Sequence, residues 1–190
     1  SRSRRSMTEV QKDAITRAIQ VAAPAGAKVV FDVADPFAVE RYWEDFLELI
    51  RDHVDVVFAN RLEAGILFGE QADDGVARLL GEHVEIGVLK TGKDGSITAT
   101  GGELIRTPGN DVEVVDTTGA SDMFAAGFLA GLALGQGVDR APVLAGELAE
   151  RVITKTGAQF GFDEIAAIRR ELLVAQVKHQ RSSGSHRGCE

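Results

Sequence analysis

The chain has 190 residues, 44% of them hydrophobic and 26% charged, which is enough apolar material to bury a substantial core as one domain or one large domain fragment. Its formal net charge of −8 argues against a general nucleic-acid binder, because an acidic surface repels a phosphate backbone. No run approaches the roughly 20 apolar residues of a membrane span, so we expect a soluble, cytoplasmic protein with no membrane partner.

Both ends of the chain are polar and rich in serine and arginine. Residues 1–7 and 180–190 lack apolar periodicity, and we expect a disordered head and a disordered tail there. The one cysteine, Cys189, lies in the tail, which excludes an internal disulfide and a cysteine-based metal cluster. Residues 8–179 are therefore the expected folded part.

Within this part, strand-like apolar runs alternate with helical patterns. In chain order we expect a helix at 8–23, a strand at 28–33, helix 36–53, strand 55–59, helices 61–68 and 73–83, strands 85–90, 96–100, 103–107 and 111–115, and helices 119–134, 138–155 and 163–179. Such alternation predicts an α/β fold with a parallel sheet covered on both faces and an antiparallel excursion near 96–107. Ligands of such sheets bind beyond the carboxyl ends of the strands.

The most informative segment is the loop Asp116-Thr117-Thr118-Gly119-Ala120-Ser121-Asp122, which leads into a helix of small residues. A glycine turn that enters a helix points several backbone N–H groups at one spot, and the positive helix end attracts anions. Asp122 falls in the first helical turn, where it is a candidate base for activating a hydroxyl against a phosphate. The alternative is an aspartate that only decorates a helix N-terminus.

Two further segments carry candidate binding residues. Asn60 and Glu63 have the spacing of a capping box, in which the asparagine caps a helix and the glutamate bonds back to it. Thr91, Gly92 and Gly95 form a turn whose missing side chains let a ligand approach the backbone. A hairpin turn with a purely structural role explains the same glycines.

Together these segments resemble the ribokinase-like sugar and nucleoside kinases, the PfkB family. Residues 116–127, DTTGASDMFAAG, are similar to the signature Asp-Thr-x-Gly-Ala-Gly-Asp, with a later Phe and Gly. In the family's order, Asn60 to Glu63 resembles Asn-x-x-Glu, Lys90 to Gly95 resembles Lys-x-Gly-x-x-Gly, and 149–158 resembles the following helix and Gly-Ala. Residues 35–37 and 58–60 look most like the bacterial adenosine-kinase and fructokinase-like branch.

The resemblance covers about residues 8–175 and implies a ribokinase-like three-layer α/β/α sandwich with a mostly parallel sheet. The N-terminal strands and the lid of that fold have no counterpart here, so the chain looks like the C-terminal, nucleotide-binding part of a kinase. An unpaired sheet edge would favour self-association, for example as a homodimer.

The resemblance also implies a role for each candidate residue. Asp122 would be the catalytic base, and the amides of Gly119, Ala120 and Ser121 would stabilise charge on the transferred phosphoryl group. Thr117 and Gly119 would also contact ATP, as would Thr91, Gly92 and Gly95. Asn60 and Glu63 would organise Mg²⁺ and the phosphates, Glu63 through metal-bound water. A potassium ion near the Asp116 loop is a further implied cofactor.

One residue departs from the family signature. Ser121 stands where the second glycine is usual, and the cost of this change depends on its backbone conformation. With positive φ the serine would cost on the order of 1 kcal/mol and crowd the phosphate, whereas in a helical conformation it would cost little and keep its amide.

The function expected from these features is ATP-dependent transfer of the γ-phosphate to an alcohol of a sugar or nucleoside, incomplete in a chain of this length. The first alternative is a nucleotide-binding regulatory pseudoenzyme or a non-catalytic fragment. A dinucleotide-binding oxidoreductase is a weaker alternative, because the chain lacks Gly-x-Gly-x-x-Gly after an early strand.

Overall fold

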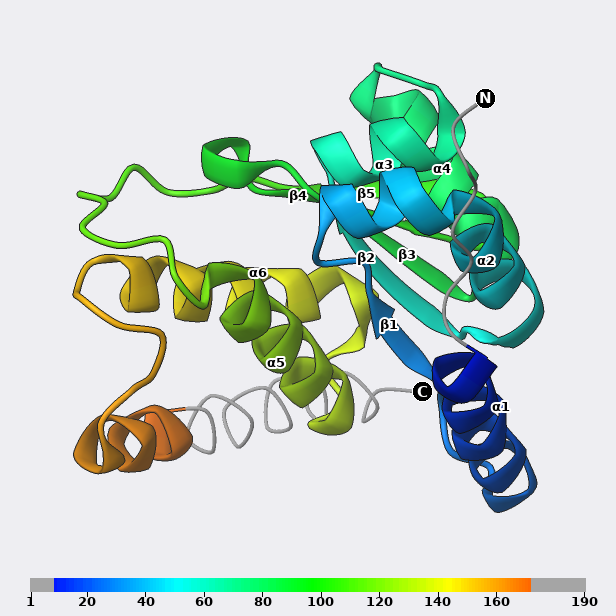
Figure 1. The fold of residues 1–190 in the computed structure, drawn as a ribbon. Coiled ribbons are helices and arrows are strands. Elements are labelled where there is room, and N and C mark those ends of the chain that lie inside the picture. The colour runs from blue at the N-terminus through cyan, green and yellow to red at the C-terminus, as the bar shows by residue number, and fades with distance from the viewer. Residues whose placement is uncertain (1–8, 172–190) are drawn as a thin grey trace, which may run out of the picture. The chain divides into compact units, whose positions relative to one another are not determined.

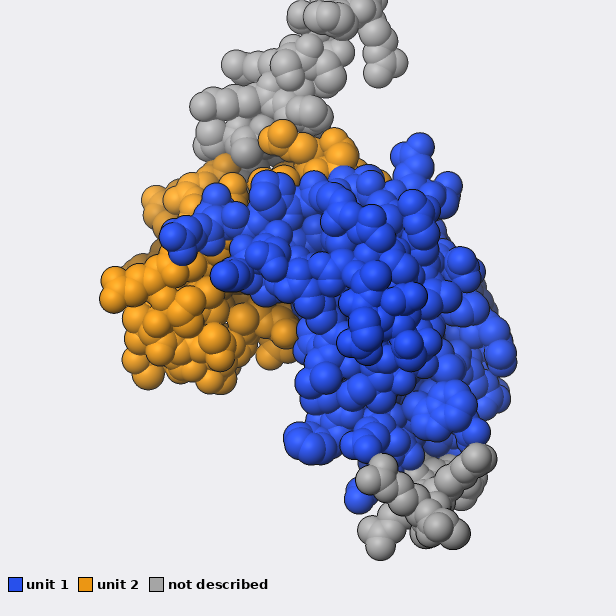
Figure 2. Space-filling view, turned by 90° about the horizontal axis from the view of Figure 1, so that it is seen from above, with its two compact units in different colours: residues 1–111 blue, residues 112–190 orange. Residues whose placement is uncertain are grey.

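The computed structural model describes residues 9–171. The expected disordered segments 1–7 and 180–190, and the end of the expected helix 163–179, lie outside this range. The chain divides into two compact units, residues 1–111 and residues 112–190 (Figure 2). The first unit contains a sheet with helices, and the described part of the second unit is built around helices.

The order of elements follows the expected alternation of helices and strands (Figure 1). The first unit comprises α1 (Glu9–Ala22), η1 (Ala23–Ala25), β1 (Val30–Asp32), α2 (Pro36–His53), β2 (Val56–Asn60), α3 (Arg61–Phe68), α4 (Asp73–His83), β3 (Ile86–Lys90), η2 (Gly92–Asp94), β4 (Ser96–Thr100) and β5 (Glu103–Thr107). The second comprises α5 (Ala120–Ala133), α6 (Gly137–Ile153) and a helix that includes residues 162–171. No helix within residues 9–171 is long and apolar enough to cross a membrane.

The sheet has five strands in the order β1-β2-β3-β4-β5. Strands β1, β2 and β3 pair in parallel, whereas β4 is antiparallel to both β3 and β5, so all strands except β4 run in one direction. The α/β class, the mostly parallel sheet and the antiparallel excursion at 96–107 are therefore confirmed. At the carboxyl ends of the parallel strands, Asn60 of β2 lies in register with Lys90 of β3.

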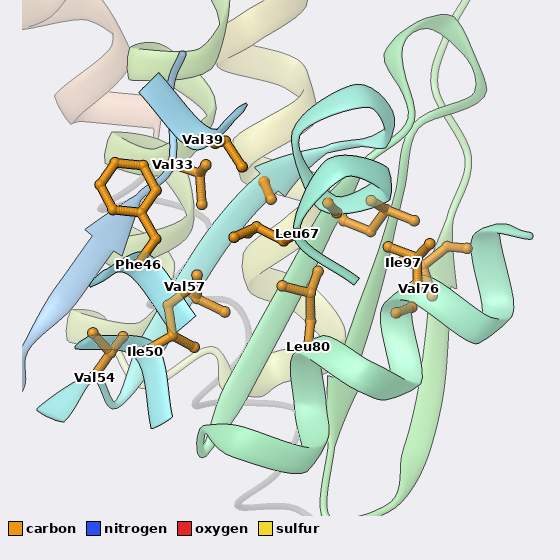
Figure 3. Close-up of a cluster of buried hydrophobic side chains, with 14 residues drawn as sticks. Val33, Val39, Phe46, Ile50, Val54, Val57, Leu67, Val76, Leu80 and Ile97 are labelled. Carbon is orange, nitrogen blue, oxygen red and sulfur yellow. The ribbon is translucent and has the colours of Figure 1, made fainter. Parts of the chain in front are cut away.

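Helices α2, α3 and α4 contribute to a hydrophobic core on one face of this sheet (Figure 3). Side chains alternate across a strand, and Val57 of β2, Leu89 of β3 and Ile97 of β4 belong to the face that meets the helices. The fully buried Ile50 and Leu80 belong to the same cluster, where each contributes about 1.5–3 kcal/mol by leaving water. This packing fixes the carboxyl ends of β2 and β3, which are followed by Glu63 and the 91–95 turn.

In the second unit, glycines let α5 and α6 approach closely. A Cβ atom added at Gly127 would lie 2.8 Å from the Cα of Ala145, and one at Gly131 would lie 2.8 Å from the Cα of Ala141. Both distances are shorter than real Cβ contacts, so neither glycine tolerates a side chain without movement of the partner helix. The spacing of four residues places the two glycines on one face of α5.

One expected element is wrong. Residues 111–115 form no strand, although their apolar residues suggested one. The amides of Val115 and Asp116 both donate to the carbonyl of Ile153, at 2.8 and 3.2 Å, and the side chains of Val114 and Val115 are 54% and 56% exposed. A β-ladder needs a partner strand, and here a single carbonyl at the end of α6 takes that place.

Candidate functional site

Asn60 and Glu63 form the expected capping box at the start of α3. The Asn60 side-chain oxygen accepts from the Glu63 amide at 2.9 Å, and the Glu63 carboxylate accepts from the Asn60 amide at 2.8 Å. The same carboxylate also accepts from the Asn60 side-chain nitrogen at 2.7 Å. These bonds orient the Asn60 side chain at the carboxyl end of β2, the edge where ligands of such sheets bind.

Glu63 is almost fully buried, with only 2% of its surface exposed, which is unusual for a glutamate. Burial raises the pKa of its carboxyl group, and the Asn60 backbone bond and nearby Lys90 partly oppose this shift. Both of its oxygens are already engaged by Asn60. Among residues 9–171, no group of three or more His, Cys, Asp or Glu side chains is arranged to hold a metal ion. In this geometry Glu63 supports Asn60, and its contact with a metal-bound water stays a prediction.

A partly buried ion pair lies near this capping box. The Nζ of Lys90 donates to both carboxylate oxygens of Asp32, at 2.8 and 2.9 Å, across the ends of β3 and β1. Lys90 also lowers the pKa of Glu63, while the charge of Asp32 raises it. No local pattern in the sequence points to Asp32 as the partner of Lys90, because the two residues are 58 positions apart in the chain.

The turn after β3 has the backbone geometry that its glycines suggested. The Thr91 amide donates to the Gly95 carbonyl at 2.9 Å, and both Gly92 and Gly95 have positive φ, 67° and 96°. A Cβ on Gly95 would lie 2.5 Å from the amide nitrogen of Gly109, so this glycine is required by space as well as by φ. Structural constraint therefore explains Gly95 fully, and its contact with a nucleotide remains a prediction.

In the second unit, Asp116 organises the start of the signature loop. One carboxylate oxygen accepts from the amide and the hydroxyl of Thr118, at 2.9 and 2.6 Å, and the other accepts from the amide of Gly157 at 2.9 Å. The Thr118 hydroxyl bond, followed by the Gly157 amide, lowers the pKa of Asp116 to about 2. Asp116 is thus ionised and holds the loop through Thr118 and Gly157, and the neighbouring Thr117 is exposed.

Gly119 is the N-cap of α5 and is held in a conformation that suits only glycine. Its φ is 81°, and an added Cβ would lie 2.8 Å from both the Cβ and the carbonyl oxygen of Ala158. Residues 157 and 158 therefore hold the start of α5 in two ways. The Gly157 amide bonds to Asp116, and Ala158 packs against Gly119. This explains why the Gly-Ala of the sequence pattern belongs with the signature loop.

The first turn of α5 presents the remaining predicted residues. Ser121 and Asp122 are exposed and helical, and Ser121 is not among the residues with positive φ. The serine therefore has a helical backbone conformation, which costs little free energy. Its amide lies at the helix start, where N–H groups lack intrahelical partners. The Ala120 amide already donates to the Thr117 carbonyl at 3.2 Å, a long bond that an anion would have to share.

The structure thus groups the predicted residues within each unit. Asn60, Glu63, Thr91, Gly92 and Gly95 lie at the carboxyl ends of β2 and β3, and Thr117, Gly119, Ala120, Ser121 and Asp122 lie at the α5 N-terminus. These features define an α/β protein with a glycine-turn helix N-terminus suited to an anion and an acid in its first turn.

Comparison with known proteins identifies the family. Residues 3–165 match the pfkB family carbohydrate kinase model, and the chain belongs to this family. It is similar to the crystal structure of adenosine kinase from Sinorhizobium meliloti, with 36% identity and a TM-score of 0.78 over 84% of this chain and 50% of that one. The ribokinase-like fold class is thereby confirmed.

Two curated relatives are similarly related in sequence. An uncharacterized sugar kinase of Archaeoglobus fulgidus is 34% identical over 133 residues, which is 70% of this chain and 52% of that protein. A cytidine kinase of Thermococcus kodakarensis is 34% identical over 137 residues, which is 70% of this chain and 49% of that protein. The chain thus spans about half the length of the curated relatives it matches.

Proposed function

We propose that this chain carries the nucleotide-binding part of an ATP-dependent phosphotransferase whose acceptor is an alcohol of a sugar or a nucleoside. The observation that supports this most is the α5 N-terminus, where Gly119 shapes a turn, Ser121 keeps a helical amide and Asp122 is exposed in the first turn. Family membership supplies the reaction class. The names of the relatives, which include a cytidine kinase and an adenosine kinase, suggest the acceptor classes to test.

In the proposed reaction Asp122 takes the proton of the acceptor hydroxyl. The alcohol oxygen then bonds to the γ-phosphorus while the bond from that phosphorus to the β-phosphate oxygen breaks, leaving ADP. The amides of Gly119, Ala120 and Ser121 stabilise negative charge on the phosphoryl oxygens, since helix N-terminal N–H groups and the helix dipole favour anions. Such donors act by position and need no change in their own protonation.

Asn60 and Glu63 are proposed to lie toward Mg²⁺ and the phosphates. Because both Glu63 oxygens bond to Asn60, the ion would be held mainly by phosphate oxygens and water, as Mg²⁺ usually is. Thr117, Thr91, Gly92 and Gly95 are proposed to contact ATP through backbone groups. The proposal also includes a potassium ion near the Asp116 loop, which is tested by the dependence of turnover on potassium salt. A cytoplasmic location is tested by cell fractionation, and a homodimer is tested by size-exclusion chromatography.

The decisive experiment combines binding with turnover. Mg-ATP binding is measured by calorimetry, and ADP release is measured with adenosine, cytidine, ribose and fructose as acceptors. Asp122→Asn should lower turnover by roughly 10²–10⁴-fold with little effect on Mg-ATP binding. Asp139→Asn is the matched control, because Asp139 is an exposed acid in the first turn of α6 in the same unit. Full turnover in Asp122→Asn, or equal losses in both variants, contradicts the assignment.

A nucleotide-binding regulatory protein is the second candidate, and the engagement of both Glu63 oxygens by Asn60 favours it, because it leaves that carboxylate without a free oxygen for a metal-bound water. Mg-ATP binding without consumption of any acceptor would support this candidate. Absence of nucleotide binding by a folded chain would leave only the non-catalytic fragment.

A further inference from the structure

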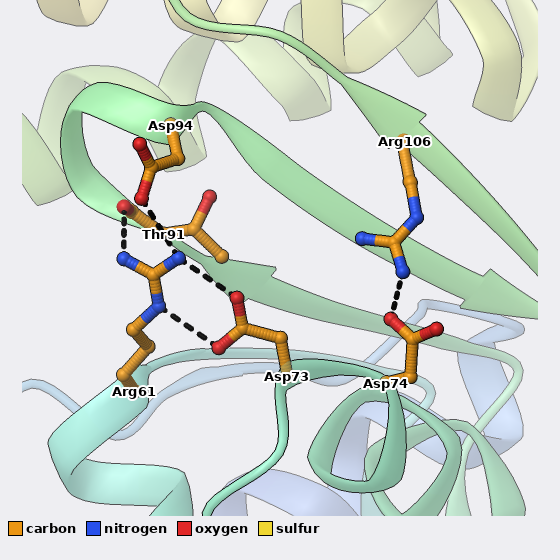
Figure 4. Close-up of polar contacts among 6 residues, drawn as sticks. All are labelled: Arg61, Asp73, Asp74, Thr91, Asp94 and Arg106. Atoms are coloured by element: carbon orange, nitrogen blue, oxygen red, sulfur yellow. Dashed lines mark hydrogen bonds and ion pairs between the residues drawn. The ribbon is translucent and has the colours of Figure 1, made fainter.

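Arg61, a residue inside the Asn60–Glu63 segment, makes contacts that neither the capping box nor the sheet requires. Its guanidinium group makes four hydrogen bonds to three different partners (Figure 4). Nε and Nη2 donate to the two oxygens of Asp73 at 2.9 and 2.8 Å, and Nη2 also donates to Asp94 at 2.9 Å. Nη1 donates to the backbone carbonyl of Thr91 at 2.7 Å.

Arg61 links the two segments that the proposed nucleotide site combines. Arg61 is the first residue of α3, directly after the N-cap Asn60, while Thr91 and Asp94 belong to the turn between β3 and β4. Backbone pairing between β2 and β3 ends at Asn60 and Lys90. Beyond that pair, Arg61 connects the turn to the start of α3, and Asp73 at the start of α4 fixes the orientation of the guanidinium group.

The charge arrangement argues that Arg61 positions other groups and does not itself bind phosphate. A cation at a helix N-terminus is unfavourable toward the helix dipole unless it is paired, and here two carboxylates pair it. Those carboxylates raise the pKa of Arg61 further, so the group is a permanent cation. Four of the five N–H groups already donate to Asp73, Asp94 and Thr91, so a phosphate that bound Arg61 would find one further N–H, on Nη1, and would meet the negative charge of both carboxylates.

The planar fork of arginine is needed for this arrangement. A bidentate bond to Asp73 leaves one nitrogen to face Thr91, and only a guanidinium group offers donors in these fixed directions. A lysine at this position can reach one of the partners but not all of them. The side chain is 44% exposed, so the pairs are partly screened and their main effect is on geometry.

We propose that Arg61 is the positioning residue that holds the Thr91–Gly95 turn against the Asn60–Glu63 capping box, and thereby sets the affinity for the nucleotide. This inference rests on the proposed function, because it assumes that both segments contact ATP. Loss of Arg61 should leave Asn60 capped while the turn moves away from it.

The chain offers a matched control for this proposal. Arg106 of β5 pairs with Asp74, the neighbour of Asp73 on α4, and its side chain is similarly exposed at 58% (Figure 4). Its ion pair is thus of the same type but does not involve the turn. Arg61→Ala, Arg61→Lys, Asp94→Asn and Arg106→Ala are compared with the unmodified chain by Mg-ATP titration and by amide hydrogen exchange of residues 91–95.

Arg61→Ala should weaken Mg-ATP binding about tenfold, a typical size for coupling through position, and should speed exchange in the turn. Arg61→Lys and Asp94→Asn should give smaller shifts in the same direction, and Arg106→Ala should change neither readout. Equal effects of Arg61→Ala and Arg106→Ala, with nucleotide binding intact in the unmodified chain, overturn this inference alone. Failure of the unmodified chain to bind Mg-ATP overturns the proposed function and the inference with it. If Arg61→Ala does not fold, Arg61→Lys and Asp94→Asn decide between these outcomes.

Discussion

Replacement of Gly119 by alanine tests how the α5 N-terminus is built. Two costs add at this position. Its φ of 81° lies in the left-handed region, which costs a residue with a Cβ about 1–2 kcal/mol. The new Cβ would also lie 2.8 Å from the Cβ and the carbonyl oxygen of Ala158, and relief of such overpacking costs about 1–3 kcal/mol. The expected loss in the free energy of unfolding is therefore roughly 2–5 kcal/mol.

Gly135, beyond the other end of α5, provides the control for this substitution. Its φ is 74°, close to that of Gly119, but an added Cβ would meet nothing within 4 Å. Gly135→Ala should therefore lose only the conformational part, about 1–2 kcal/mol. The free energy of unfolding of both variants is measured by urea denaturation, monitored by the circular dichroism of the helices. The difference between the two losses isolates the contact with Ala158.

A third variant separates the atoms involved. In Gly119→Ala with Ala158→Gly, the Cβ–Cβ contact is removed while the Ala158 carbonyl contact remains, so recovery should be partial. Equal unfolding free energies for Gly119→Ala and Gly135→Ala would refute the argument that loop 157–158 supports the helix start.

Two further predictions concern local energetics. Asp116 has its pKa lowered to about 2, so its hydrogen bonds stabilise the folded state above the unfolded pKa near 4, and this stabilisation is lost as pH falls from about 4 to 2. The difference in urea midpoint between the unmodified chain and Asp116→Asn should accordingly shrink across that window, and a constant difference would contradict the assignment. Ala34 has a φ of 60° in a turn where the Asp35 amide bonds to the Val33 carbonyl, so Ala34→Gly should stabilise the chain by about 0.5–1 kcal/mol. Ala126→Gly in the middle of α5 should instead destabilise it by about 0.5–1 kcal/mol, and a shared sign would contradict the strain at Ala34.

The start of α3 shows how far local sequence reasoning reaches. The spacing of Asn60 and Glu63 predicted a capping box, and both of its hydrogen bonds are present. It could not predict that Glu63 would be buried with both oxygens engaged, because burial depends on the elements packed around it. The expected roles of these residues toward Mg²⁺ and ATP remain predictions.

The loop before α5 shows the opposite limit. The apolar residues at 111–115 predicted a strand, but a strand exists only where a partner offers its edge, and here the amides of Val115 and Asp116 bond to the Ile153 carbonyl. The sequence did not decide whether Ser121 in place of glycine is destabilising, because that cost in free energy depends on the φ angle of the residue. Its place within the helix settled that question.

The sequence by itself determined the order and type of nearly all described elements, together with the glycine turn at 119, because these depend on patterns within a few residues. Only the tertiary structure decided the partners: Arg61 bonds to residues 12, 30 and 33 positions away, and Lys90 bonds to Asp32, 58 positions away. Hydrogen bonds and ion pairs require groups within about 3 Å, and such distances are set by the packing of the whole chain and not by its local pattern.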